Sequence, residues 1–143
     1  MLKLGMAFTP MLTVHDVEAT SAWLCSVLPL SSAHGGPDFE MLADSNGETI
    51  MWLHISNEKS SHPHPHPQLE NIDMTNPGSG VVVYLCVATQ EELRAIHDNA
   101  LKANAHIYEA PTVNPNARSM EFTFRSPDGY RFAVHTPFGS VQP

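Results

Sequence analysis

Two residues near the C-terminal end, Glu121 and His135, are of the types that acid–base chemistry uses. They stand on either side of residues 126–129, Ser-Pro-Asp-Gly, which is typical of a β-hairpin turn. If Arg125 pairs with Arg131 around that turn, Glu121 and His135 become cross-strand neighbours. A carboxylate beside an imidazole can act as a general base or bind a cation. More often such a pair is a structural contact on a sheet, so both interpretations stay open.

Nine histidines raise the question of a metal site. The densest group is His62-Pro63-His64-Pro65-His66-Pro67. Alternating prolines favour a polyproline II path with about three residues per turn, so side chains two residues apart point in different directions. Three imidazoles therefore cannot close on one ion without bending the segment. We interpret the run as a stiff, exposed linker rather than as an adventitious or functional metal site.

Composition limits the possible partners. The 143 residues suffice for one domain, and 42% apolar with 15% charged residues is a globular balance. A net charge of −8 argues against nucleic acid and anionic membrane surfaces, and it tolerates cationic ligands. Cys25 and Cys86 lie in apolar runs and are expected to be buried free thiols. With neither a leader pattern nor an apolar membrane-spanning stretch, we expect a cytoplasmic protein.

The first half of the chain predicts a strand, a helix and a hairpin. Residues 7–14 have a strand pattern, and Asp16 then provides a helix N-cap. Pro29 ends the helix. Two further strands, 39–43 and 49–55, follow around the turn Asp44-Ser45-Asn46-Gly47.

The second half repeats this order. After a strand at 81–87, Thr89 and Glu92 have the spacing of a capping box. The helix carries an inward-facing stripe, and a strand at 105–108 and a link rich in Pro and Asn follow it. The closing hairpin comprises 120–125 and 131–135. The stripe residues are Leu93, Ile96, His97, Ala100 and Leu101.

The repeat has a period of about 73 residues, which takes Val14 onto Val87. We expect an α+β fold of two βαβββ modules, approximately 6–57 and 80–137, joined by a linker at 58–79. Each half alone leaves one sheet face bare. Two halves can curve those faces around a shared cavity, with the helices on the outer face. The sequence therefore predicts a curved mixed sheet in a single domain, 1–143.

Strand alternation indicates which side chains face the cavity. One set is uniformly apolar and is expected to pack under the helices: Leu12, Val14, Val83, Leu85, Val87, Phe122, Phe124, Phe132 and Val134. The opposite set is mixed in character, as ligand pockets are. It comprises Thr9, Met11, Thr13, Val82, Tyr84, Cys86, Glu121, Thr123, Arg125, Arg131, Ala133 and His135.

Two segments resemble a known family. Residues 12–20, LTVHDVEAT, and residues 122–134, FTFRSPDGYRFAV, resemble the first strand–helix junction and the closing hairpin of the vicinal oxygen chelate superfamily, which includes glyoxalases, bleomycin-resistance proteins and dioxygenases. Ser126 replaces an Asp of the usual motif. The likeness covers residues 6–137. It implies a cup-shaped sheet that holds ligands or substrates, with a metal at four cavity-facing positions in metal-dependent members.

The resemblance places three of those four positions at Thr9, Val82 and Ala133. The fourth is Met51 or Trp52, depending on the register of the first hairpin. None of these side chains offers the imidazole or carboxylate that divalent metals need. We therefore expect no metal and no other cofactor, which argues against the superfamily's metal-dependent activities.

The leading hypothesis is a metal-independent protein that binds a small aromatic or cationic molecule, as bleomycin-resistance-type members do. One alternative is a lyase, isomerase or dioxygenase-like enzyme that uses non-standard residues such as Glu121, His54 and His135. A second is a dimeric interaction module without catalysis; a homodimer is expected in any case. The predicted ligand-binding residues are Thr9, Met11, Trp52, His54, Val82, Tyr84, Thr123, Arg125, Arg131 and His135.

Overall fold

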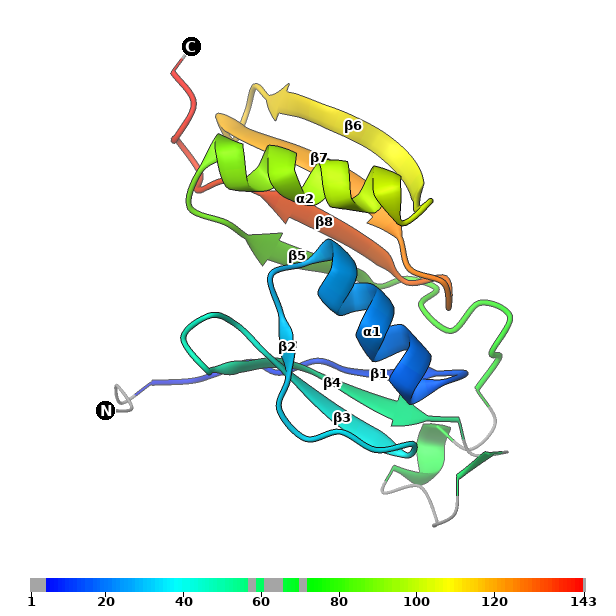
Figure 1. Ribbon diagram of the computed structural model, residues 1–143. Helices are drawn as coiled ribbons and strands as arrows, with labels where there is room; N and C mark the ends of the chain where they lie inside the picture. Colours follow the sequence, from blue (N-terminus) through cyan, green and yellow to red (C-terminus); the bar gives the residue numbers. More distant parts are fainter. Residues whose placement is uncertain (1–4, 57–58, 61–65, 70–71, 143) are drawn as a thin grey trace. The chain divides into compact units, whose positions relative to one another are not determined.

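The computed structural model describes residues 5–56, 59–60, 66–69 and 72–142. These residues form two compact units, and the division between them at 71/72 falls within the predicted linker. The first unit spans 1–25 and 29–71, and the second spans 26–28 and 72–143. Among the described residues each unit contains one α-helix and one four-stranded mixed sheet (Figure 1).

The first unit runs β1 (Met11–Val14), α1 (Val17–Val27), β2 (Ser31–Ser32), β3 (Phe39–Ala43) and β4 (Thr49–Ile55). Its strand order is β1-β4-β3-β2, with β1 parallel to β4 and the other pairs antiparallel. As predicted, Asp16 caps α1, because its Oδ1 accepts a hydrogen bond from the Ala19 N–H at 2.9 Å. The predicted β3–β4 turn is also present: Asp44 Oδ1 accepts from the backbone of Asn46 and Glu48.

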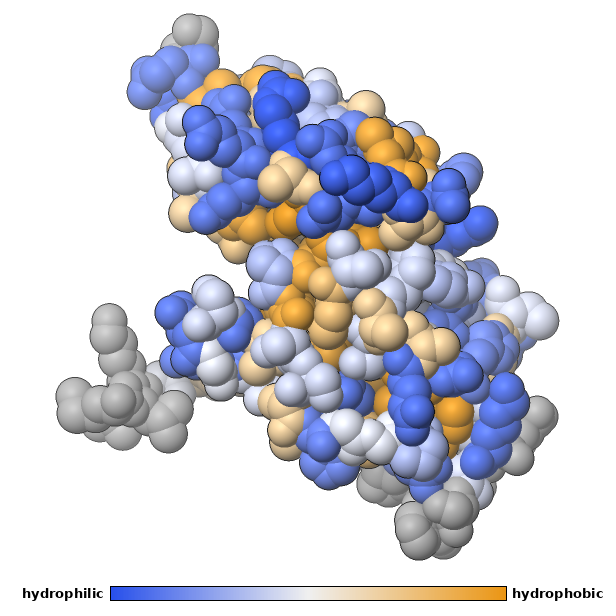
Figure 2. All heavy atoms as spheres, in the orientation of Figure 1, coloured by the Kyte–Doolittle hydropathy of each residue, from blue (hydrophilic) through white to orange (hydrophobic). Residues whose placement is uncertain are grey.

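The second unit runs β5 (Val82–Cys86), α2 (Gln90–Lys102), β6 (His106–Asn114), β7 (Ser119–Arg125) and β8 (Arg131–His135). Its strand order is β5-β8-β7-β6, with β5 parallel to β8. The capping box at the start of α2 is confirmed: Thr89 accepts from the Glu92 N–H, and the Glu92 side chain accepts from the Thr89 backbone. The outward side of α2 is hydrophilic (Figure 2).

The apolar parity predicted from sequence forms the core of each unit. Phe122, Phe124 and Phe132 are fully buried and stack on one another, with ring centroids 5.6 and 5.3 Å apart. His97 of α2 packs edge-on against Phe122, so α2 covers this face of its sheet. In the first unit Leu42, Met51 and Leu53 are fully buried on the corresponding face.

Three strands differ from the predictions. β1 begins at Met11, not at residue 7, because Pro10 has no N–H to donate and only its carbonyl pairs, with Trp52 N. β6 continues to Asn114, whereas 105–108 was expected. Its register shifts around Glu109 and Thr112 accommodate Pro111 on an edge strand. The short strand β2 was not predicted.

Two burial predictions were wrong. Cys86 is exposed and Cys25 is only partly buried. Leu101 is 51% exposed, so the buried part of the α2 stripe comprises Leu93, Ile96 and Ala100.

The structure describes part of the predicted linker. Pro67–Leu69 form the short 3-10 helix η2, and Gly78 lies buried at the start of the second unit. A Cβ built on Gly78 would stand 2.6 Å from Cδ1 of Tyr130, so the linker's end packs against the closing hairpin. Residues 62–65 of the His-Pro run lie outside the described residues, and the linker interpretation of that run stays a prediction.

The predicted fold class is confirmed. Both units follow the order βαβββ, and the strands belong to two four-stranded mixed sheets. In the part of the chain that the structure describes, no helix is long and apolar enough to cross a membrane.

Candidate functional site

The second unit has one sheet face that its helix does not cover. Strand register places the side chains of this face, which we call the open face of the second unit, in three cross-strand rows. The rows run from β5 through β8 to β7. They are Val82–Arg131–Arg125, Tyr84–Ala133–Thr123 and Cys86–His135–Glu121. All seven residues predicted in this half of the molecule to bind ligand or act in catalysis are therefore neighbours, and Ala133 lies at their centre.

The pairing of Glu121 with His135 is confirmed, together with that of Arg125 with Arg131. Glu121 also accepts a hydrogen bond from Asn114 Nδ2 at 3.4 Å. His135 Nδ1 lies 2.8 Å from the Thr136 carbonyl oxygen. A carbonyl can only accept, so Nδ1 carries the proton and Nε2 holds the lone pair. The geometry permits acid–base chemistry, and a catalytic role for the two residues stays a prediction.

Aromatic rings surround His135. The Phe138 ring stacks on the imidazole at 5.1 Å between centroids, and Tyr84 meets it edge-on at 5.9 Å. Tyr84 is 61% exposed and Phe138 is 72% exposed. In the row at the other end of this face, Arg131 lies over the Tyr108 ring, with Cζ 3.8 Å from its centroid. This face therefore offers flat apolar surfaces next to charged and hydrogen-bonding groups.

The first unit has a corresponding open face, on which Trp52 is 38% exposed whereas Thr13 and the predicted ligand-binding residue His54 are buried. Its rows are Met11–Trp52–Met41 and Thr13–His54–Phe39. The register settles the alternative left open by the sequence: Trp52 lies on this face, while Met51 lies on the opposite, fully buried one. Phe39 contacts Trp52 and His54 edge-on, with centroids 5.6 and 6.4 Å away. His54 Nδ1 lies 2.7 Å from the Ile55 carbonyl oxygen, so it repeats the geometry of His135.

The positions implied for a metal do not fit one. Val82, Ala133 and Trp52 have no donor atom that a divalent metal prefers, and Thr9 lies exposed outside β1. Within residues 5–56, 59–60, 66–69 and 72–142, no three His, Cys, Asp or Glu side chains are grouped in a way that could hold a metal ion. The donor set is thus wrong for the metal chemistry implied by the resemblance.

Glu40 is a buried carboxylate that the sequence did not reveal. It is 3% exposed and lies on β3 beneath α1. Its Oε1 accepts from the backbone N–H groups of residues 34, 35 and 41, and its Oε2 accepts from the hydroxyls of Ser21 and Ser32. Burial raises its pKa, but these hydrogen bonds outweigh burial and lower the pKa to about 2. The charge anchors the loop before β3 and faces away from the open face.

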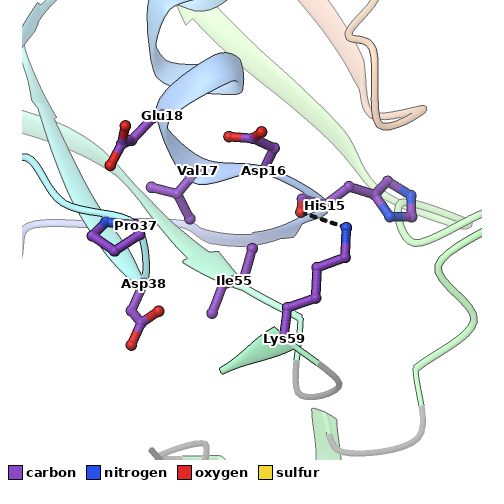
Figure 3. Close-up of a pocket in the computed structure, with 8 residues that line it drawn as sticks. All are labelled: His15, Asp16, Val17, Glu18, Pro37, Asp38, Ile55 and Lys59. Carbon is purple, nitrogen blue, oxygen red and sulfur yellow. Dashed lines mark hydrogen bonds between the residues drawn. The ribbon is translucent and has the colours of Figure 1, made fainter. Parts of the chain in front are cut away.

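A second feature missed by the sequence reasoning is a cavity of about 340 Å³ in the first unit, at the start of α1 (Figure 3). Asp16, Glu18 and Asp38 surround it together with Lys59, whose Nζ donates to the His15 carbonyl at 3.2 Å. The remaining lining residues are Val17, Pro37 and Ile55. Asp16 was interpreted only as the N-cap of the helix, which it indeed is. None of the predicted ligand-binding residues lines this cavity.

Comparison with known proteins identifies a family model that matches residues 7–134. It is described as the Glyoxalase/Bleomycin resistance protein/Dioxygenase superfamily. A search of curated proteins found no match.

Several solved structures share the fold. A glyoxalase-related enzyme from Fulvimarina pelagi has a TM-score of 0.71 and 13% identity, covering 98% of this chain and 96% of its own. A glyoxylase/bleomycin resistance protein/dioxygenase domain from Frankia sp. EAN1pec has a TM-score of 0.69 and 18% identity, covering 94% and 99%. A virulence protein from Salmonella typhimurium has a TM-score of 0.62 and 20% identity, covering 95% and 99%. At these identities the likeness concerns the fold alone.

Proposed function

Since this chain belongs to the Glyoxalase/Bleomycin resistance protein/Dioxygenase superfamily, we propose that it binds a small aromatic or cationic molecule on its open sheet faces without a metal. The observation that carries the proposal is the replacement of metal ligands by Trp52, Val82 and Ala133. Exposed rings flank these positions, Trp52 itself in the first unit and Tyr84 in the second. Aromatic surfaces bordered by a few polar groups are the usual lining of a small-molecule site.

The net charge of the chain favours a cationic aromatic ligand over an anionic one, although Arg125 and Arg131 place two positive charges on the second unit's open face. The net charge of −8 draws cations, and the faces of Trp52 and Tyr84 attract them through their ring quadrupoles. Glu121 adds a carboxylate to the open face of the second unit, on which Tyr84 also lies. In this proposal the two modules form a single domain, and the free thiols Cys25 and Cys86 fit a cytoplasmic location.

Calorimetric titration tests the proposal with three matched planar probes: an aromatic cation, a neutral aromatic and an aromatic anion. We expect saturable binding that is tightest for the cation. Tyr84→Ala and Trp52→Ala should weaken it by about tenfold or more, as hot-spot aromatics do. Trp23→Phe, a change in α1, should leave it unaltered. Absence of saturable binding by all three probes would refute the proposal.

The metal-free aspect is tested separately. Protein purified without a tag and dialysed against chelator should hold no stoichiometric metal, and added Zn²⁺, Mn²⁺ or Ni²⁺ should not raise its unfolding temperature. A ligand that binds only the folded state must raise it. A stoichiometric ion that survives dialysis would contradict this part of the proposal.

A second candidate function is pairing of two copies as a homodimeric interaction module. Val82 (43% exposed), Tyr84 and Phe138 are apolar side chains exposed in the second unit, and exposed apolar groups of this size often mark contact surfaces. Light scattering after size exclusion tests it. A monomer that is unchanged by Tyr84→Ala would exclude this role for the open face.

A further inference from the structure

The third row of the second unit's open face combines three groups with complementary chemistry. Cys86 pairs with His135 in the parallel β5–β8 ladder, and His135 pairs with Glu121 in the antiparallel β7–β8 ladder. Neighbouring strands lie about 4.8 Å apart, and paired residues point to the same face. A thiol, an imidazole and a carboxylate therefore lie on one face of the sheet in that order, in a single cross-strand row within the second unit, although they are not grouped closely enough to hold a metal ion.

The imidazole is oriented to act as a base. Its Nδ1–H is held by the Thr136 carbonyl at 2.8 Å, which leaves the lone pair on Nε2 at the far edge of the ring. The ring plane is fixed by stacking on Phe138, at an interplanar angle of 18°. Among the described residues Nε2 has no hydrogen-bond partner. Nucleophilic sites commonly have this arrangement, in which a third group orients the base.

The thiol is accessible to small molecules. Cys86 is exposed, and its Sγ makes only a weak contact with the Val87 carbonyl at 3.8 Å. Cys25 provides an internal comparison, because it is partly buried on α1. Burial raises the pKa of the Cys25 thiol, and the nearby charge of Glu40 raises it further, against a lowering by the hydrogen bond with Ser21. Since the thiolate is the nucleophile, Cys25 should react slowly.

We propose that Cys86 is a nucleophile with His135 as its general base, and that it forms covalent adducts with α,β-unsaturated carbonyl compounds bound on the open face. The thiol proton passes to His135 Nε2 as sulfur attacks the β-carbon and forms a C–S bond. The C=C electron pair moves onto the carbonyl as an enolate, which takes the proton from Nε2 at its α-carbon. All atoms of both reactants remain in the adduct, so no co-reactant is needed.

Glu121 is the third member of the row. It flanks His135 on the side opposite Cys86, and Asn114 holds its carboxylate. The inference rests on the proposed function, because the open face must first bind the electrophile.

The test uses the full chain and N-ethylmaleimide, a small α,β-unsaturated imide, with the labelled residues mapped by mass spectrometry at pH 7.0. We expect Cys86 to react at least about tenfold faster in the folded protein than in the urea-unfolded chain, and faster than Cys25. Cys86→Ala should leave only the slow reaction at Cys25. His135→Gln should lower the Cys86 rate by about tenfold. His106→Gln, on the same sheet but outside the row, should not change it.

Two outcomes overturn the inference: a folded Cys86 rate no higher than in the unfolded chain, or a rate unaffected by His135→Gln. Urea unfolding of each variant shows whether a lowered or raised rate reflects loss of the fold. Calorimetry of the Cys86→Ala variant with the aromatic cation separates the two proposals. If Cys86→Ala still binds the aromatic cation, and Cys86 in the wild-type chain reacts no faster than in the unfolded chain, only the nucleophilic role of Cys86 is refuted. A fast Cys86 rate without binding of any planar probe refutes only the proposed ligand site.

Discussion

At the scale of single residues, Glu40 shows how one charge can hold a loop in place. Its two oxygens accept five hydrogen bonds from α1, β2, β3 and the segment between the two strands. Hydrogen bonds to a charged acceptor are stronger than those to a neutral one. A pKa lowered from 4.5 to about 2 corresponds to about 3 kcal/mol of stability at neutral pH.

The sign of the pH dependence follows from that pKa. Because the pKa of Glu40 is lower in the folded state, its contribution is present above pH 4.5 and is lost as the pH falls from 4.5 toward 2. We expect Glu40→Gln to lower the free energy of unfolding by about 2 kcal/mol at pH 7, and by less at pH 3. Urea titrations at both pH values measure this. Glu48→Gln, an exposed change in the β3–β4 turn, is the control; equal losses in the two variants would contradict the anchoring role.

At the scale of elements, the capping box of α2 makes the next prediction. Thr89→Ala removes the acceptor of the Glu92 N–H, which lies 3.1 Å from Thr89 Oγ1. The free energy of unfolding should fall by about 1 kcal/mol, whereas Thr89→Ser should retain most of it because serine also caps well. Urea unfolding followed by circular dichroism compares the two. Equal stability of Thr89→Ala and wild type would show that tertiary packing alone holds the start of this helix.

The approach of the linker to the closing hairpin gives a second prediction at this scale. In Gly78→Ala the new methyl group would meet the Tyr130 ring at 2.6 Å, and Tyr130 is 5% exposed and has little room to move. Overpacking of this kind costs about 1–3 kcal/mol. Ser79→Ala, at the next and exposed position, should change stability by less than about 0.5 kcal/mol. Similar midpoints for the two variants would mean that this end of the linker does not pack as described.

The elements also show what the sequence could predict and why the rest was missed. The alternation of apolar and polar residues correctly predicted that Phe122, Phe124 and Phe132 are buried, because successive side chains of a strand point to opposite faces of the sheet and only one face packs under the helix. The sequence prediction ended β6 too early, at residue 108, because Pro111 and two register shifts break that alternation beyond Tyr108. Glu40 was missed for another reason. Its donors come from residues up to 19 positions away in the sequence, and no local pattern brings them together.

The same distinction applies to the candidate site. Register arguments correctly paired Glu121 with His135, since a short hairpin fixes its own cross-strand partners. The exposure of Cys86 was predicted wrongly from its apolar neighbours, because alternate residues of β5 point to opposite faces. Met51 and Trp52 could not be distinguished from sequence, since a shift of one residue exchanges the two faces. Only the observed ladder with β1 decided between them.

At the scale of the whole molecule, the proposal of a single domain can be tested with probes that the chain already contains. Both tryptophans, Trp23 and Trp52, lie in the first unit, and Cys86 lies in the second. If the two units unfold as one cooperative domain, the urea transition followed by tryptophan fluorescence and the one followed by the expected fall in the Cys86 labelling rate must coincide. Gly78→Ala, a change in the second unit, should then shift the tryptophan midpoint as far as the labelling midpoint. If only the labelling midpoint moves, the two βαβββ units fold independently, and the ligand site must be sought within one unit.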